Sequence, residues 1–116
     1  MIVAFSVQPS GEPSDPALAR DLGEGADSAS VHNAVAAAVR VVRESGLPTR
    51  TSSMFTEIEG EWEEVMEVVR RATAEAGRYG SRVSLVLKAD IRPGRSSELD
   101  GKVERLQQAL DRLERR

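Results

Sequence analysis

Hydrophobic residues recur along this chain with two different periods, and the periods divide it into strands and helices. Alternation with a period of two predicts strands within residues 1–8, 48–60 and 82–92, and a period near 3.6 predicts helices at 31–45, 61–77 and 98–115. In the first strand, Val3, Phe5 and Val7 share one face, and Ser6 is the polar exception on the other face. Regular elements are therefore expected over most of the chain.

The helix predicted at 31–45 is rich in valine and alanine. Its apolar stripe is expected to consist of Val31, Val35, Val39 and Val42. The alanines between these valines would let the helix sit close to its neighbour. Ser28 or Ser30 is expected to cap the start of this helix, and Gly46 is expected to end it.

The stretch 48–60 predicts two short strands joined by a bend, with a helix after them. Alternation places Met54, Thr56 and Ile58 on one face of the second strand, and Phe55, Glu57 and Glu59 on the other. The apolar stripe of the following helix is expected to comprise Trp62, Val65, Met66, Val69, Ala72 and Ala76.

The last predicted helix, 98–115, has a narrower apolar seam than a typical globular helix. The seam residues follow one another at intervals of four and three, and they are Leu99, Val103, Leu106, Leu110 and Leu113. This spacing is typical of a coiled-coil contact. The seam can pack either on the chain's own sheet or on a partner chain, and the pattern leaves both open.

The order of elements predicts an α+β fold. Strand–helix–strand–strand–helix–strand in about 100 residues is the ferredoxin-like βαββαβ sandwich, here with an extra C-terminal helix. The 116 residues are expected to form one domain, with 9–30 as a long acidic loop that holds five acids and one base. One face of such a sheet carries no helices, so self-association is expected.

Composition excludes several classes of protein. The chain has no cysteine, which excludes disulfides and thiolate metal sites, and its single histidine is His32. The net charge of −3 without a basic cluster argues against nucleic acid as a partner. No apolar run is long enough for a membrane span, and the N-terminus does not resemble a signal peptide, so a cytoplasmic protein is expected.

Candidate chemistry is sparse. Glu57 and Glu59 would share a strand face about 7 Å apart, a separation at which paired carboxylates can act in hydrolysis. A solvated strand edge explains these residues equally simply. No glycine-rich phosphate loop or nucleophile elbow is present. Trp62, directly after the Glu57–Glu61 cluster, suits either a core position or stacking on a cationic or heteroaromatic ligand.

Several stretches of the chain match one known family: MIVAFSVQP at the start, Ser30-Val31 and Val35-Ala36, residues 44–47, Met54 and Thr56, residues 58–66, Arg82-Val83-Ser84, Asp90 and Arg92. In these stretches the chain resembles the thiamine-binding protein family, which is related to the YkoF-like hydroxymethylpyrimidine-binding proteins. The chain departs from the family pattern where His32 replaces a serine, Ala34 a tyrosine and Phe55 a glycine. Phe55 could then take over stacking from the missing tyrosine.

The resemblance implies binding of thiamine or a pyrimidine precursor without catalysis, no required cofactor, and sheet-to-sheet dimers or tetramers. Carried onto this sequence, the ligand-binding positions are Ser6, Ser30, His32 and Asn33 for hydrogen bonds, Thr56 and Glu59 for polar anchoring, and Phe55 or Trp62 for stacking. Two alternatives stay open: a structural or regulatory homo-oligomer whose pocket is filled or changed, and an enzyme that uses Glu57 and Glu59.

Overall fold

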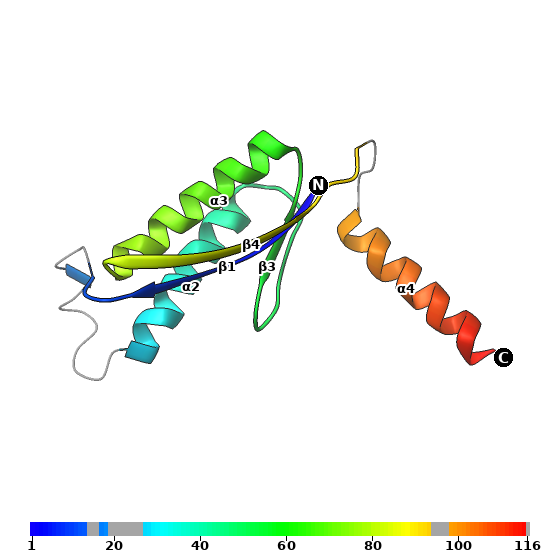
Figure 1. Cartoon of the computed structure of the whole chain (residues 1–116), viewed down its shortest axis with the longest axis horizontal. Coiled ribbons are helices and arrows are strands. Elements are labelled where there is room, and N and C mark those ends of the chain that lie inside the picture. The colour runs from blue at the N-terminus through cyan, green and yellow to red at the C-terminus, as the bar shows by residue number, and fades with distance from the viewer. Residues whose placement is uncertain (14–16, 19–26, 94–97, 116) are drawn as a thin grey trace.

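The chain forms a four-stranded antiparallel sheet with two helices side by side on one face (Figure 1). The computed structural model describes residues 1–13, 17, 18, 27–93 and 98–115. Its elements are β1 (Ile2–Ser10), α2 (Asp27–Glu44), β2 (Thr49–Thr51), β3 (Thr56–Glu59), α3 (Trp62–Ala76), a 3₁₀ turn (Gly77–Tyr79), β4 (Arg82–Asp90) and α4 (Glu98–Glu114). The predicted order and α+β class are confirmed, and the fold is ferredoxin-like with an added helix.

The strands follow the order β2-β3-β1-β4, and their lengths are unequal. β4 pairs with β1 from Ile2 to Ser10, whereas β3 pairs with β1 only from Ile2 to Phe5. From Ile2 to Phe5, β1 therefore has a paired strand on both sides. From Ser6 to Ser10, the described strands pair with it on the β4 side only.

The core lies between the sheet and the two helices that cover it. Val3, Phe5 and Val7 are buried, as the alternation in β1 predicts, because every second side chain of a strand points to the same face. From α3 the core receives Val65, Val68, Val69, Ala72 and Ala76. The predicted burial of Trp62 is wrong: 55% of its surface is exposed at the start of α3.

The face that α2 buries differs from the predicted valine stripe. The side chain of Val31 lies outside the described residues. Ala34 and Ala38 are buried together with Val42, which is buried as predicted, whereas Val35 is 37% exposed and Val39 is half-buried. All five residues are apolar, so hydrophobicity alone does not choose between the two faces. The small alanines allow α2 to approach the sheet and α3 closely, as expected, and this rotation leaves two valines at the surface.

The connection between β1 and α2 has different bounds from the predicted loop. β1 extends to Ser10 and α2 begins at Asp27, so the connection is shorter than the predicted 9–30. Residues 14–16 and 19–26 of that connection lie outside the described residues. Ser28 and Ser30 are within α2 rather than at its cap. Gly46 follows the helix with φ of 77°, a left-handed conformation that suits glycine, so the predicted stop is confirmed.

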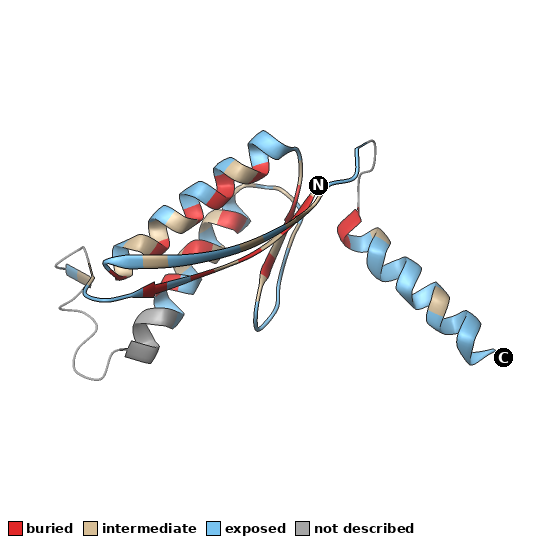
Figure 2. Ribbon diagram, in the orientation of Figure 1, coloured by how far each residue is buried: buried red, intermediate tan, exposed pale blue. Residues whose placement is uncertain are grey.

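The last helix, α4, extends away from the rest of the fold (Figures 1 and 2). Leu99 is buried in its first turn, but the remaining seam residues are between 41% and 65% exposed, namely Val103, Leu106, Leu110 and Leu113. The sequence left two possibilities for this seam, packing on the chain's own sheet or on a partner chain. The first is wrong for every seam residue after Leu99.

Candidate functional site

A groove opens between α2 and the tip of the β2–β3 hairpin. The groove lies where β3 begins at Thr56. Beyond Phe5, the edge of β1 on the β3 side has no pairing strand among the described residues. Backbone N–H and C=O groups on an unpaired strand edge are available to hydrogen-bond a ligand. The groove therefore combines an open strand edge with the exposed valine face of α2.

The inner part of the groove is a pocket of about 350 Å³. Its lining residues come from β1, α2 and the hairpin, and they are Phe5, Ser6, Val7, Gln8, Val35, Ala38, Val39, Thr51, Ser52, Ser53, Met54, Phe55 and Thr56. None of these side chains is ionisable. A volume near the low end of the usual range for small-molecule sites, with apolar walls and a few hydroxyl and amide groups, suits a neutral ring.

A network of hydrogen bonds in the hairpin tip holds one wall of this pocket in place. The backbone N–H of Ser52 donates to the carbonyl of Phe55 at 2.8 Å. The Ser52 hydroxyl oxygen accepts the backbone N–H groups of Met54 at 3.3 Å and Phe55 at 3.2 Å. Such side-chain-to-backbone bonds fix tight turns. The half-buried Phe55 therefore belongs to a tight turn whose backbone is held by hydrogen bonds.

The outer part of the groove is a wider, more open pocket of about 770 Å³ that shares Val35, Val39 and Ser53 with the inner part. Its other lining residues are His32, Ala36, Arg40, Arg43 and Glu44. These positions lie along one side of α2, because residues three and four apart on a helix share a face. The groove is therefore uncharged inside and ionic at its mouth.

The structure brings together four of the eight sequence-predicted site residues. Ser6, Phe55 and Thr56 line the inner pocket, and His32 lines the outer one. Asn33 lines a separate pocket between α2, the end of α3 and the 3₁₀ turn. Ser30 lies in α2, and its side chain is outside the described residues.

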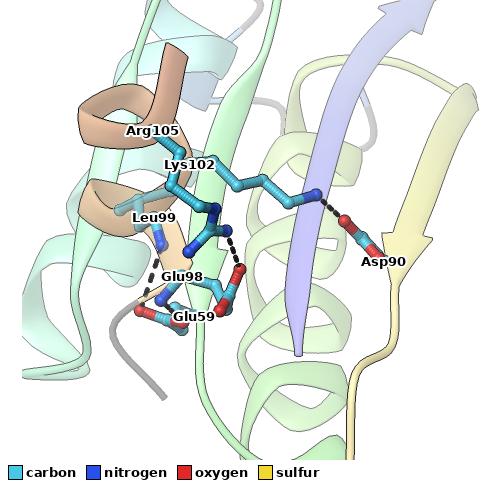
Figure 3. Close-up of polar contacts among 6 residues, drawn as sticks. All are labelled: Glu59, Asp90, Glu98, Leu99, Lys102 and Arg105. Atoms are coloured by element: carbon cyan, nitrogen blue, oxygen red, sulfur yellow. Dashed lines mark hydrogen bonds and ion pairs between the residues drawn. The ribbon is translucent and has the colours of Figure 1, made fainter. Parts of the chain in front are cut away.

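The other two predicted residues lie at the far end of β3 from the groove. Trp62 begins α3 and lines none of the described pockets. Glu59 faces α4 instead (Figure 3). Glu59 as a whole is only 6% exposed, and its carboxylate accepts the backbone N–H groups of Glu98 at 2.5 Å and Leu99 at 3.5 Å. A carboxylate at a helix N-terminus satisfies free N–H groups and favours the helix dipole, so this contact anchors α4.

Ion pairs complete the anchor of α4 on the sheet. Lys102 pairs with Asp90 of β4, and Arg50 of β2 pairs with Asp100 (Figure 3 shows the first). Within α4, Arg105 contacts the carboxylate of Glu98 at 2.7 Å. These side chains are largely exposed except that of Glu98, so each pair contributes little beside the buried carboxylate of Glu59.

Comparison with known sequences identifies the family. The sequence model described as "Thiamine-binding protein" matches residues 23–107, which is most of the chain and includes α2, the hairpin and β4. The chain belongs to the thiamine-binding protein family. Over 115 residues it is also 44% identical to the UPF0045 proteins Mb1933 of Mycobacterium bovis and MT1949 of Mycobacterium tuberculosis, with 98% of each chain covered.

Solved structures agree with this family assignment at the level of the fold. A protein from Bacillus cereus described as a domain of unknown function, DUF77, is 28% identical with a TM-score of 0.68, and the match covers 88% of this chain and 85% of that one. A candidate thiamine biosynthesis or salvage protein of Thermotoga maritima is 20% identical with a TM-score of 0.58, covering 86% and 95%. The second likeness supports the ferredoxin-like fold alone.

Several residues of this family member's groove were missed by the sequence reasoning. Val35 and Val39 were assigned to the core, and Arg40 and Arg43 were not considered at all. A signal was available: Ala34 and Ala38 are the small residues, spaced by one helical turn, that close packing requires. Turning the helix to bury them brings the valines and arginines to the groove.

Other kinds of site find no support in the part of the chain that the structure describes. No group of three or more histidine, aspartate or glutamate side chains could hold a metal ion there. None of the helices described is both long and apolar enough to cross a membrane. On the exposed side of α3, the hydrogen bond from Arg70 lowers the pKa of the Glu67 carboxyl, but neither residue lines the groove.

Proposed function

We propose that this protein binds a small heteroaromatic molecule of the thiamine type, thiamine itself or its aminopyrimidine part, in the groove between α2 and the hairpin. The observation that carries the proposal is the inner pocket, which is lined both by the part of β1 that β3 leaves unpaired and by Phe55. An aminopyrimidine both donates and accepts hydrogen bonds, as a strand edge does, and its ring can stack on an aromatic side chain. Membership of the thiamine-binding family supports the same ligand class.

Binding without chemical conversion fits the groove better than catalysis does. The inner pocket holds no carboxylate, imidazole or amine that could act as a general acid or base. The glutamate pair that the sequence offered is not in the groove, since Glu59 is occupied by the backbone of α4. The alternative of an oligomer with a filled pocket is disfavoured by the space of about 350 Å³ beside Phe55.

Isothermal titration with thiamine and with hydroxymethylpyrimidine tests the proposal. Saturable binding is expected for at least one of them, weakened about fivefold or more by Phe55→Ala, because stacking on an aromatic ring contributes about 1 kcal/mol or more beyond the buried area. Trp62→Ala is the matched control, since it removes an aromatic side chain outside the groove. Loss of binding with Trp62→Ala and not with Phe55→Ala would place the ligand elsewhere.

We further propose that α4 joins two copies of this chain. Its exposed seam has the four–three spacing of a coiled coil, which is complementary to a second copy of itself. Leu106→Glu is expected to lower the molecular mass measured by analytical ultracentrifugation. Gln108→Glu adds the same charge off the seam and is expected to leave the mass unchanged. Equal masses for both variants and the parent chain would refute a contact through this seam.

A further inference from the structure

The charges of the groove are separated along its length. Among the described residues, the inner pocket is lined by no ionisable side chain, whereas the outer pocket has Arg40, Arg43 and His32 against a single carboxylate, Glu44. A ligand that fills both parts would therefore contact neutral, partly aromatic side chains in the inner pocket and mostly basic side chains in the outer pocket.

The basic character of the mouth rests mainly on Arg43. Arg40 is 3.9 Å from Glu44, at the limit of an ion pair, and the two charges offset each other in part. Arg43 forms no ion pair with any described residue, although it lines the same pocket. It follows Val39 by one turn of α2, a rise of about 6 Å, so its guanidinium is within reach of a substituent on a ring held at Val39.

The acidic groups that would balance a cationic ligand lie elsewhere. Glu57 and Glu59 belong to β3 and line neither part of the groove, and Glu59 already accepts two N–H groups of α4. The positive thiazolium of thiamine would therefore meet only Glu44, beside two arginines. An anionic substituent would meet guanidinium groups, which bind phosphate oxygens in pairs of hydrogen bonds.

We infer that the ligand of this groove is a heteroaromatic ring that carries a phosphomonoester, with the ring in the inner pocket and the phosphate at Arg43 and Arg40. This inference rests on the proposed function and narrows its ligand class. The His32 imidazole can add a hydrogen bond to the phosphate. The phosphorylated pyrimidine is then preferred over both the free pyrimidine and free thiamine.

The test compares five titrations on the full chain: hydroxymethylpyrimidine, its phosphate monoester, thiamine, thiamine monophosphate and inorganic phosphate. The phosphomonoesters are expected to bind about tenfold or more tightly than their unphosphorylated forms, since charge-assisted hydrogen bonds are the strong ones. Because Arg40 remains, Arg43→Gln is expected to remove most of that difference rather than all of it, and Arg43→Lys to restore part of it. Arg71→Gln, an exposed arginine of α3 outside the groove, is the control of equal charge.

The outcomes separate the inference from the function on which it rests. Equal affinities for phosphorylated and free forms, unchanged by Arg43→Gln but weakened by Phe55→Ala, would overturn the phosphate assignment and keep the groove as a pyrimidine site. Binding of the phosphomonoesters that is no tighter than that of inorganic phosphate, and that Phe55→Ala leaves unchanged, would overturn the shared site for ring and phosphate. Failure of all the ring compounds to bind would overturn the proposed function together with the inference.

Discussion

Replacing the buried carboxylate of Glu59 with an amide tests the assignment of this residue to α4 rather than to the ligand. Glu59→Gln keeps the shape of the side chain but removes its charge. The 2.5 Å bond from Glu98 is the main interaction lost, because the bond from Leu99 at 3.5 Å is weak. A hydrogen bond to a charged group contributes roughly 1.5–3 kcal/mol, and about half of that remains with a neutral acceptor.

With the lost interaction with the dipole of α4, roughly 0.3–1 kcal/mol, added to it, the free energy of unfolding should fall by about 1–2.5 kcal/mol. For a chain of this size the melting temperature should fall by about 4–10 °C. The assay is urea denaturation followed by circular dichroism, at one protein concentration, because self-association would couple stability to concentration.

Glu57→Gln is the matched control, since Glu57 is on the same strand and its side chain makes no hydrogen bond with the described residues. It should change the free energy of unfolding by less than about 0.5 kcal/mol. Indistinguishable stabilities for the two variants would refute the anchoring role of Glu59. Ligand affinity separates the two roles further: Glu59→Gln should leave it unchanged, and a tenfold loss with normal stability would return Glu59 to the binding site.

Three other substitutions examine α2 and its end. Ala34 is fully buried, so Ala34→Leu should lower the free energy of unfolding by about 1–3 kcal/mol through overpacking. Thermal denaturation measures this change, and an unchanged stability would contradict close packing of this face. Val39→Ala should alter stability by less than about 1.5 kcal/mol yet weaken ligand binding up to about tenfold in titration, and an unchanged affinity would remove it from the site. Gly46→Ala meets no neighbouring atom, so its cost of about 1–2 kcal/mol should come from the left-handed backbone alone, and a stabilised variant would refute that conformation.

The strands and their order could be predicted from the sequence because alternation is a local property. Val3, Phe5 and Val7 in β1, and Thr56 and Ile58 in β3, are buried as the period of two requires. The buried face of α2 could not be predicted in the same way. Valine and alanine both count as apolar, and the choice between them depends on how closely the neighbouring element approaches.

The position of the groove is also a tertiary property. It exists because β3 is shorter than β1, a relation between two segments that are far apart in the sequence. Phe55, Thr56 and Ser6 were nonetheless predicted as ligand-binding residues from the residues and the family resemblance, and they line the groove. The role of Glu59 could not be predicted, because its hydrogen-bond partners are backbone groups of α4. No pattern of side chains in a sequence shows which backbone N–H groups a carboxylate will accept.

The shortness of β3 has a consequence for how this protein can vary in evolution. Thr56, at one end of the strand, lines the groove, and Glu59, at the other end, holds α4. Because successive side chains alternate between faces, deleting one residue within β3 would move a glutamate into the core and detach α4 at the same time. The tip of the hairpin, residues 52–55, is free of that constraint. Insertions there would reshape the wall of the pocket while the anchor of α4 stays in register, so new ligand preferences should arise at the tip first.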